Sequence, residues 1–123
     1  MNKTAISICE WEAIAFFGSE PVSREYGTKW FDSDSLYEVT DKNGLKLSCA
    51  LHPIHKDVRL CLYQKEKKFY AWQAQDLEDI CYIEEKERTI LKIVVSQRDS
   101  LILQVSPEIS INRKTEPGRA ANG

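Results

Sequence analysis

The chain has 123 residues, of which 42% are hydrophobic and 29% charged, a balance typical of one globular domain with its own hydrophobic core. Its formal net charge of −2 makes nucleic acid an unlikely main partner, because neutralising phosphates needs a surplus of Lys and Arg. Glu10 and Glu12 interrupt the apolar N-terminal run, so it predicts neither a secretory signal nor a membrane span. We therefore expect a cytoplasmic protein whose four cysteines are reduced.

The first 17 residues are predicted to form a helix. Ser7 and Glu10 have the spacing of a capping box, and Gly18 stands where a left-handed C-cap is common. Apolar side chains surround most of the circumference, which predicts a deeply buried helix. A strand over residues 4–9 is the alternative. Residues 18–35 show no periodicity and predict a long connection that carries the aromatic pair Trp30-Phe31.

A first hairpin is predicted from residue 36, where "LYEVT" and "LKLSCAL" alternate on either side of "DKNG". Gly44 takes the left-handed position at the end of the turn. The register that follows pairs Val39 with Leu47 and Tyr37 with Cys49, so apolar residues face each other.

Three further strand pairs follow in order. "DVRLCLYQ" and "FYAWQA" are joined by the charged tetrad 65–68, and "DICYIEE" and "RTILKIVV" by a turn near Glu85-Lys86. A five-residue loop, "SQRDS", then joins "TILKIVV" to "LILQV", and a short final strand covers residues 109–111. In the first of these pairs the expected partners are Cys61 with Trp72 and Tyr63 with Tyr70. In the third pair they are Val95 with Leu101, Ile93 with Leu103 and Leu91 with Val105.

The predicted fold class is α+β and mostly β. An N-terminal helix packs on a six- or seven-stranded antiparallel meander, which forms a curved sheet or an open barrel. Residues 1–111 are expected to form a single domain. Residues 112–123 are polar and contain Gly and Pro, which predicts a flexible tail.

The stretch "SCALHPIHKDVRLC" holds both histidines and two of the cysteines and suggests a zinc site or a cysteine nucleophile. Strand alternation argues against both, because Cys49 falls on the core face and Cys61 on the opposite face, so they cannot bind one ion. A buried Cys49 would also be unreactive. We therefore predict no metal, no cofactor and no catalytic residue, with His52 and His55 in the loop between two strands.

The sequence contains more aromatic and acidic side chains than its core needs, and these two groups predict partner-binding surfaces. The aromatic group is expected beside Arg59 on the outer face of the sheet, unless the N-terminal segment or the loop 18–35 covers it. The acidic group lies before and after the strand that begins at residue 79, where it either steers a basic partner or only solvates an edge. The candidate residues are Trp30, Phe31, Tyr63, Tyr70, Trp72, Asp76, Glu78, Asp79, Glu84 and Glu85.

The function that these features favour is a non-catalytic protein-binding module. Its most concrete version is an immunity-type inhibitor that neutralises a basic toxin or nuclease. Two alternatives from other classes remain. One is a β-barrel that binds a small molecule. The other is an enzyme in which Asp32 or Asp34 works with His52 or His55, and it requires these groups to converge in one cleft.

Overall fold

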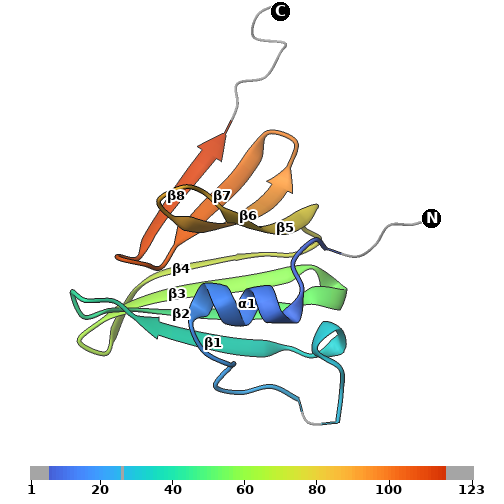
Figure 1. Ribbon diagram of the computed structural model, residues 1–123, viewed down its shortest axis with the longest axis horizontal. Helices are drawn as coiled ribbons and strands as arrows, with labels where there is room; N and C mark the ends of the chain where they lie inside the picture. Colours follow the sequence, from blue (N-terminus) through green and yellow to red (C-terminus); the bar gives the residue numbers. More distant parts are fainter. Residues whose placement is uncertain (1–5, 26, 116–123) are drawn as a thin grey trace, which may run out of the picture.

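The computed structural model describes residues 6–25 and 27–115, and within them it contains one α-helix and eight antiparallel strands (Figure 1). The strands form two four-stranded sheets, sheet A in the order β1-β2-β3-β4 and sheet B in the order β5-β6-β7-β8. The elements are α1 (Glu10–Phe17), the 3-10 turn η1 (Trp30–Asp32), β1 (Ser35–Thr40), β2 (Leu45–His52), the 3-10 turn η2 (Pro53–His55), β3 (Asp57–Gln64), β4 (Lys67–Ala74), β5 (Asp79–Glu84), β6 (Thr89–Ser96), β7 (Asp99–Gln104) and β8 (Ser110–Thr115).

The predicted class is confirmed: a mostly β, α+β fold with the helix packed on antiparallel strands. The meander is longer than predicted and divides into two sheets, so the described residues form no closed barrel. Side chains fill the space between α1 and the two sheets with one buried core. A barrel that encloses a ligand is therefore excluded for this part of the chain.

Helix α1 starts later than predicted. Its first turn is capped at Cys9, whose N–H donates to the Glu12 carboxylate at 3.1 Å, as in half of a capping box. Ser7 cannot cap the helix because its N–H and hydroxyl both donate to Asp79, each at 2.7 Å. Gly18 ends the helix with φ +81°, as predicted. Residues 1–5 of the predicted helix lie outside the described residues.

Only one side of α1 faces the core. Ala13, Phe16 and Phe17 are buried, whereas the Trp11 side chain is 65% exposed. The prediction of a helix buried on most sides is thus wrong for Trp11, because the two sheets cover only the opposite side of the helix. Phe17 stacks on Tyr37 of β1 with ring centroids 4.6 Å apart.

The first hairpin forms as predicted, with Val39 opposite Leu47 and Tyr37 opposite Cys49. Gly44 has φ +85°, a conformation that glycine adopts without steric cost. Asp41 organises the turn, since its carboxylate accepts hydrogen bonds from the N–H groups of Asn43 and Leu45.

The β3–β4 register differs from the prediction by one residue. A two-residue turn over Lys65 and Glu66, both with positive φ, replaces the expected four-residue turn. The register of the pair also shifts at a bulge between Leu62 and Tyr63. Trp72 therefore pairs with Leu60, and Tyr70 pairs with Leu62. Because a one-residue shift moves side chains to the other face, both aromatic residues turn to the face that carries Leu60 and Leu62.

Residues 75–78 carry the chain from sheet A to sheet B. Leu77 is fully buried there, and its N–H donates to the Lys56 carbonyl. The N–H of Glu78 donates to the Val94 carbonyl of β6. A second link joins the sheets, because the second carboxylate oxygen of Asp41 accepts from the Ile109 N–H at 3.0 Å.

Sheet B contains the other register difference. Ile93 pairs with Leu101 and Leu91 with Leu103, two residues from the prediction, because a two-residue turn over Gln97 and Arg98 and a bulge near Val95 replace the five-residue loop. The two-residue shift leaves the faces unchanged. Strand β8 runs to Thr115, so residues 112–115 of the predicted tail are paired with β7; residues 116–123 lie outside the described residues.

Candidate protein-interaction surfaces

The two cysteines of "SCALHPIHKDVRLC" point to opposite faces, as the strand alternation predicted. Cys49 is fully buried opposite Leu60, whereas Cys61 lies opposite Ser48 and Ala71. Burial raises the pKa of the Cys49 thiol to about 12, so it stays protonated and unreactive. In the described part of the chain, no three His, Cys, Asp or Glu side chains are grouped to hold a metal ion.

The histidine loop brings together part of the group that the enzyme interpretation requires. His52 Nε2 lies 3.3 Å from the backbone carbonyl oxygen of Asp32, and the rings of His52 and His55 meet edge to face at 4.4 Å. Asp34 is engaged elsewhere, because both of its carboxylate oxygens accept from Arg59 Nη2 at 2.7 Å.

The hollow beside this loop does not collect the candidate groups. It measures about 280 Å³ and is lined by His55, Asp57, Gln75 and Asp76. His52 and the two aspartates of the enzyme interpretation do not line it. A second hollow at the loop, lined by Ile54, His55, Lys56, Asp76 and Leu77, does not collect them either, so the described geometry does not favour catalysis by these groups.

The predicted aromatic surface is not assembled. Tyr63 stays on the outer face of sheet A, where the Lys46 ammonium lies 5.5 Å from its ring centroid. Tyr70 and Trp72 are half-buried on the other face. This correction follows from the β3–β4 register, since the bulge separates Tyr63 from its predicted partner.

The aromatic pair in the long connection is also divided. Trp30 is buried, and its indole N–H donates to the Tyr37 hydroxyl at 2.8 Å. Phe31 is half-buried in η1. Trp30 thus belongs to the core, and it is not accessible to a partner.

The predicted acidic residues lie at both ends of β5, an edge strand of sheet B. Asp76 and Glu78 are exposed before it, whereas Asp79 is half-buried. Burial acts to raise the pKa of Asp79, but the hydrogen bonds from Ser7, Cys81 and Ile80 bring it below its ordinary value. Asp79 therefore stays ionised and fixes the N-terminal segment to β5.

The far end of β5 carries Glu84 and Glu85, both exposed. Glu84 accepts a hydrogen bond from the Tyr82 hydroxyl at 2.9 Å, and Glu85 pairs with Arg88 at 2.8 Å. The pKa of Tyr82 is raised, by burial and then by the charges of Glu84 and Glu12. Two carboxylates thus lie around one tyrosine.

Trp11 completes this surface and was not among the predicted site residues. Its ring meets Tyr82 edge to face with centroids 6.2 Å apart, although 71 positions separate the two in sequence. We call Trp11, Glu12, Tyr82 and Glu84 the acidic edge. The sequence offered one signal for it: Glu10 and Glu12 flank Trp11 in an otherwise apolar run, which marks that side of α1 as exposed.

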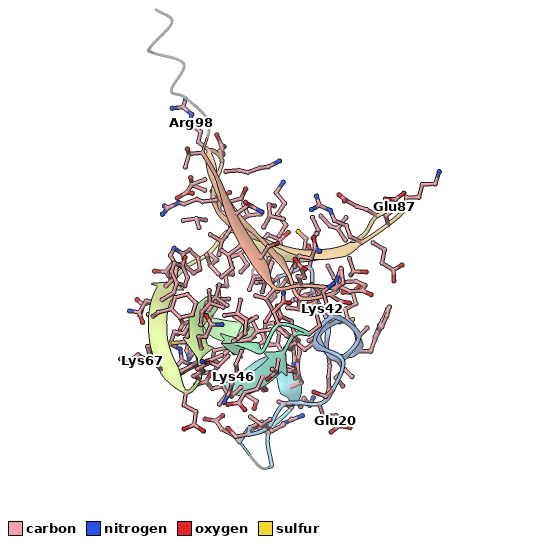
Figure 2. The ribbon with its side chains drawn as sticks, turned by 90° about the vertical axis from the view of Figure 1, so that its left-hand side faces the viewer. Glu20, Lys42, Lys46, Lys67, Glu87 and Arg98 are labelled. Carbon is pink, nitrogen blue, oxygen red and sulfur yellow. The ribbon has the colours of Figure 1, made fainter. Side chains whose placement is uncertain are left out.

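A second surface lies on the outer face of sheet B and was also missed. Figure 2 shows this sheet bending into an open trough between the turns that carry Arg98 and Glu87. The hollow measures about 490 Å³. We call it the cationic trough; four aliphatic and four basic side chains line it together with the acidic Glu85 and Asp99. The aliphatic residues are Ile83, Ile90, Val94 and Ile102, and the basic residues are Arg88, Lys92, Arg98 and Lys114.

No protein-family model and no curated protein matches the sequence. The fold is similar to that of a chain in the contact-dependent growth inhibition toxin–immunity protein complex from Klebsiella pneumoniae 342. The TM-score is 0.78, and the match covers 92% of this chain and 98% of that chain at 16% sequence identity. Such a likeness establishes a shared fold across nearly the whole length of both chains. No helix in residues 6–25 and 27–115 is long and apolar enough to cross a bilayer.

Proposed function

We propose that this protein is an immunity-type inhibitor, a non-catalytic module that binds a protein toxin and neutralises it. The observation that carries the proposal is the fold match over 92% of the chain to a chain from a toxin–immunity protein complex. The geometry of the histidine loop supports a binding role over catalysis, because Asp34 is held by Arg59 and the remaining groups share no cleft among the described residues.

The acidic edge is the contact surface that we favour for a basic toxin, such as a nuclease. A toxin that acts on nucleic acid needs a positive surface to bind phosphates, and exposed carboxylates steer such a surface toward the inhibitor. Trp11 supplies the large, accessible aromatic ring that dominates many protein interfaces. Asp76 and Glu78 extend the negative charge beyond the first end of β5, whereas Glu85 at the other end is paired with Arg88 and lines the trough.

The proposal includes a cytoplasmic location. All four cysteines are free, at Cys9, Cys49, Cys61 and Cys81, which is common where thiols are kept reduced. Among the residues predicted for partner binding, Asp76, Glu78 and Glu84 remain in the proposed surface together with Glu12, whereas Asp79 holds the N-terminal segment and Glu85 lines the trough. Trp11 and Tyr82 take the place of the aromatic residues of sheet A.

The test is toxin neutralisation in cells. The chain is co-expressed with candidate toxins, beginning with any toxin-like protein encoded beside its gene, and we expect one of them to be neutralised, with growth restored and a complex that co-elutes in size-exclusion chromatography. A toxin that remains fully active beside an excess of folded inhibitor, with no complex on the column, would overturn the proposal.

A further inference from the structure

The outer face of sheet B is unusual because its floor is aliphatic. Leu91 and Ile93 of β6 face the core, so the alternate residues Ile90 and Lys92 face outward. Ile90 and Ile102 nevertheless expose only 4% and 7% of their surface. Ile83, which pairs with Ile90, lines the same hollow and is half-buried, so part of its aliphatic surface is accessible. The result is an apolar strip at the base of an open concave surface.

The charged walls of this hollow are strongly unbalanced. Its two acidic residues are already paired, Glu85 with Arg88 and Asp99 with Arg113. Lys92, Arg98 and Lys114 form no ion pair with any described residue. Three cations thus gather in one hollow of a chain whose formal net charge is −2. Because isolated like charges repel, such a grouping is favourable when an anionic group binds there.

We infer that the cationic trough binds an acidic segment of the partner protein. Carboxylates of that segment pair with Lys92, Arg98 and Lys114, and an aliphatic side chain packs on the accessible part of Ile83. The inference rests on the proposed function, since it takes the segment to belong to the toxin. The trough is thus a second contact surface for the toxin. Its charge is opposite to that of the acidic edge, and it lies on the other face of β5.

The lining of the trough favours a peptide over nucleic acid. Single-stranded nucleic acid is held by aromatic side chains on which bases stack, and no Trp, Tyr or Phe lines this hollow in the described structure. An aliphatic floor instead matches a Leu or Ile side chain. Charge and shape together therefore point to a segment that contains both carboxylates and an aliphatic residue.

The direct test uses a synthetic peptide, acetyl-Glu-Asp-Leu-Glu-Ile-Asp-amide, titrated into the full-length protein and followed by backbone amide NMR shifts. We expect shifts in β6 and β7 and binding tighter than ~1 mM at ~50 mM salt, weakening about tenfold at ~500 mM salt. The Lys92→Gln/Lys114→Gln variant should bind about tenfold more weakly, because two exposed charge pairs are lost. The matched control is Lys67→Gln/Lys68→Gln on β4, which removes the same charge from sheet A and should change the affinity less than about twofold.

Four results would overturn the inference. The acidic peptide fails to bind, or its amide analogue built from Gln and Asn binds equally well. A thymidine oligonucleotide binds the trough more tightly than the peptide. The protein self-associates in sedimentation experiments and loses that association in the Lys92→Gln/Lys114→Gln variant, which would make a second copy the occupant. In the last of these results, the Lys92→Gln/Lys114→Gln variant binds the toxin as tightly as the unmodified protein does.

The outcome for the proposed function is measured separately. If the unmodified protein neutralises the toxin but does not bind the peptide, the trough is overturned and the inhibitor role stands. If the peptide binds but the toxin remains active, the inhibitor role is overturned. The acidic segment that binds the trough then does not belong to the toxin.

Discussion

The acidic edge and the cationic trough lie on opposite faces of strand β5 and are built in different ways. The acidic edge depends on a contact between a helix and a strand, because the ring of Trp11 in α1 packs edge to face against Tyr82 in β5. The trough depends on strand alternation and on the bend of one sheet, which bring Lys92 of β6, Arg98 of the β6–β7 turn and Lys114 of β8 around one hollow. A chain with a small net charge thus presents two strongly charged surfaces of opposite sign.

The comparison teaches that net charge is a poor guide to the partner. A net charge of −2 suggests a basic partner and agrees with the acidic edge alone. The unpaired charges of the acidic edge and of the trough have opposite signs, so a partner that covers both surfaces must itself carry both signs. Electrostatic complementarity of this kind favours one orientation of docking over others.

The largest effect is expected from Trp11→Ala, which removes the aromatic centre of the acidic edge. Loss of a central interface tryptophan costs at least ~2 kcal/mol of binding free energy, or about 30-fold in Kd. Isothermal titration calorimetry with the toxin measures it. Because Trp11 is mostly exposed, the thermal midpoint should hardly change.

Phe69→Ala provides the matched control, since Phe69 is a 57% exposed aromatic residue on β4 of sheet A. It should alter the toxin affinity less than about twofold. An equal loss in both variants would show that exposed aromatic area in general, and not the acidic edge, determines affinity.

The next effect concerns the link between the sheet that carries both surfaces and the rest of the fold. Asp41→Asn weakens the hydrogen bonds from Ile109, Leu45 and Asn43, and should lower the free energy of unfolding by about 1–2 kcal/mol. Urea denaturation measures it. Lys42→Gln, in the same turn, removes only an exposed ion pair with Glu108 and should cost less than about 0.5 kcal/mol.

The Asp41 effect should depend on pH in a defined direction. The hydrogen bond from Ile109, followed by those from Leu45 and Asn43, holds the pKa of Asp41 below its ordinary value of 3.8. Its stabilisation is therefore fully present above that value and is lost as pH falls through the lower pKa of the folded state. The difference between the natural protein and Asp41→Asn should shrink from pH 6 to pH 3; a difference that grows would contradict this assignment.

A smaller effect is expected when the sign of the acidic edge is reversed. Glu12→Lys/Glu84→Lys should slow association with a basic toxin about tenfold at low salt, because long-range steering is lost, with a smaller change in dissociation. Stopped-flow fluorescence measures both rates. The difference should nearly vanish at ~500 mM salt, and a difference that persists there would mean that the two carboxylates make direct contacts instead.

The smallest effect is expected at the histidine loop, which lies outside both charged surfaces. His52→Ala/His55→Ala should leave toxin affinity and neutralisation within about twofold of the natural protein, since neither ring touches the acidic edge or the trough in the described structure. Calorimetry and a growth assay measure this. Loss of neutralisation without loss of binding would revive the enzyme interpretation.

Local signals explain which parts of the fold were predictable. The first hairpin has Gly44 at a position that needs positive φ, so its register follows from the sequence. In the β3–β4 turn, Lys65 and Glu66 have positive φ instead. Because neither is Gly or Asn, the sequence does not indicate where this turn lies. The bulge beside that turn has no sequence signal either, because it depends on packing across strands.

The consequences of the two register errors differ for a physical reason. The one-residue error in β3–β4 moved Tyr70 and Trp72 to the wrong face and produced a false aromatic surface. The two-residue error in β6–β7 kept Ile93 and Leu101 on one common face, as their predicted pairings implied, and the structure places both in the core. Neither the Trp11–Tyr82 contact nor the trough was predictable, since both depend on tertiary packing between distant segments.

The central claim is that the partner binds the two faces of β5. Hydrogen–deuterium exchange of the protein, free and in complex with the toxin, tests it most directly. We predict slower exchange in α1, β5, β6 and the β6–β7 turn at Gln97-Arg98, with unchanged exchange in the η2 loop and the β3–β4 turn. Protection confined to sheet A or to the histidine loop, with α1 and sheet B unchanged, would contradict the account.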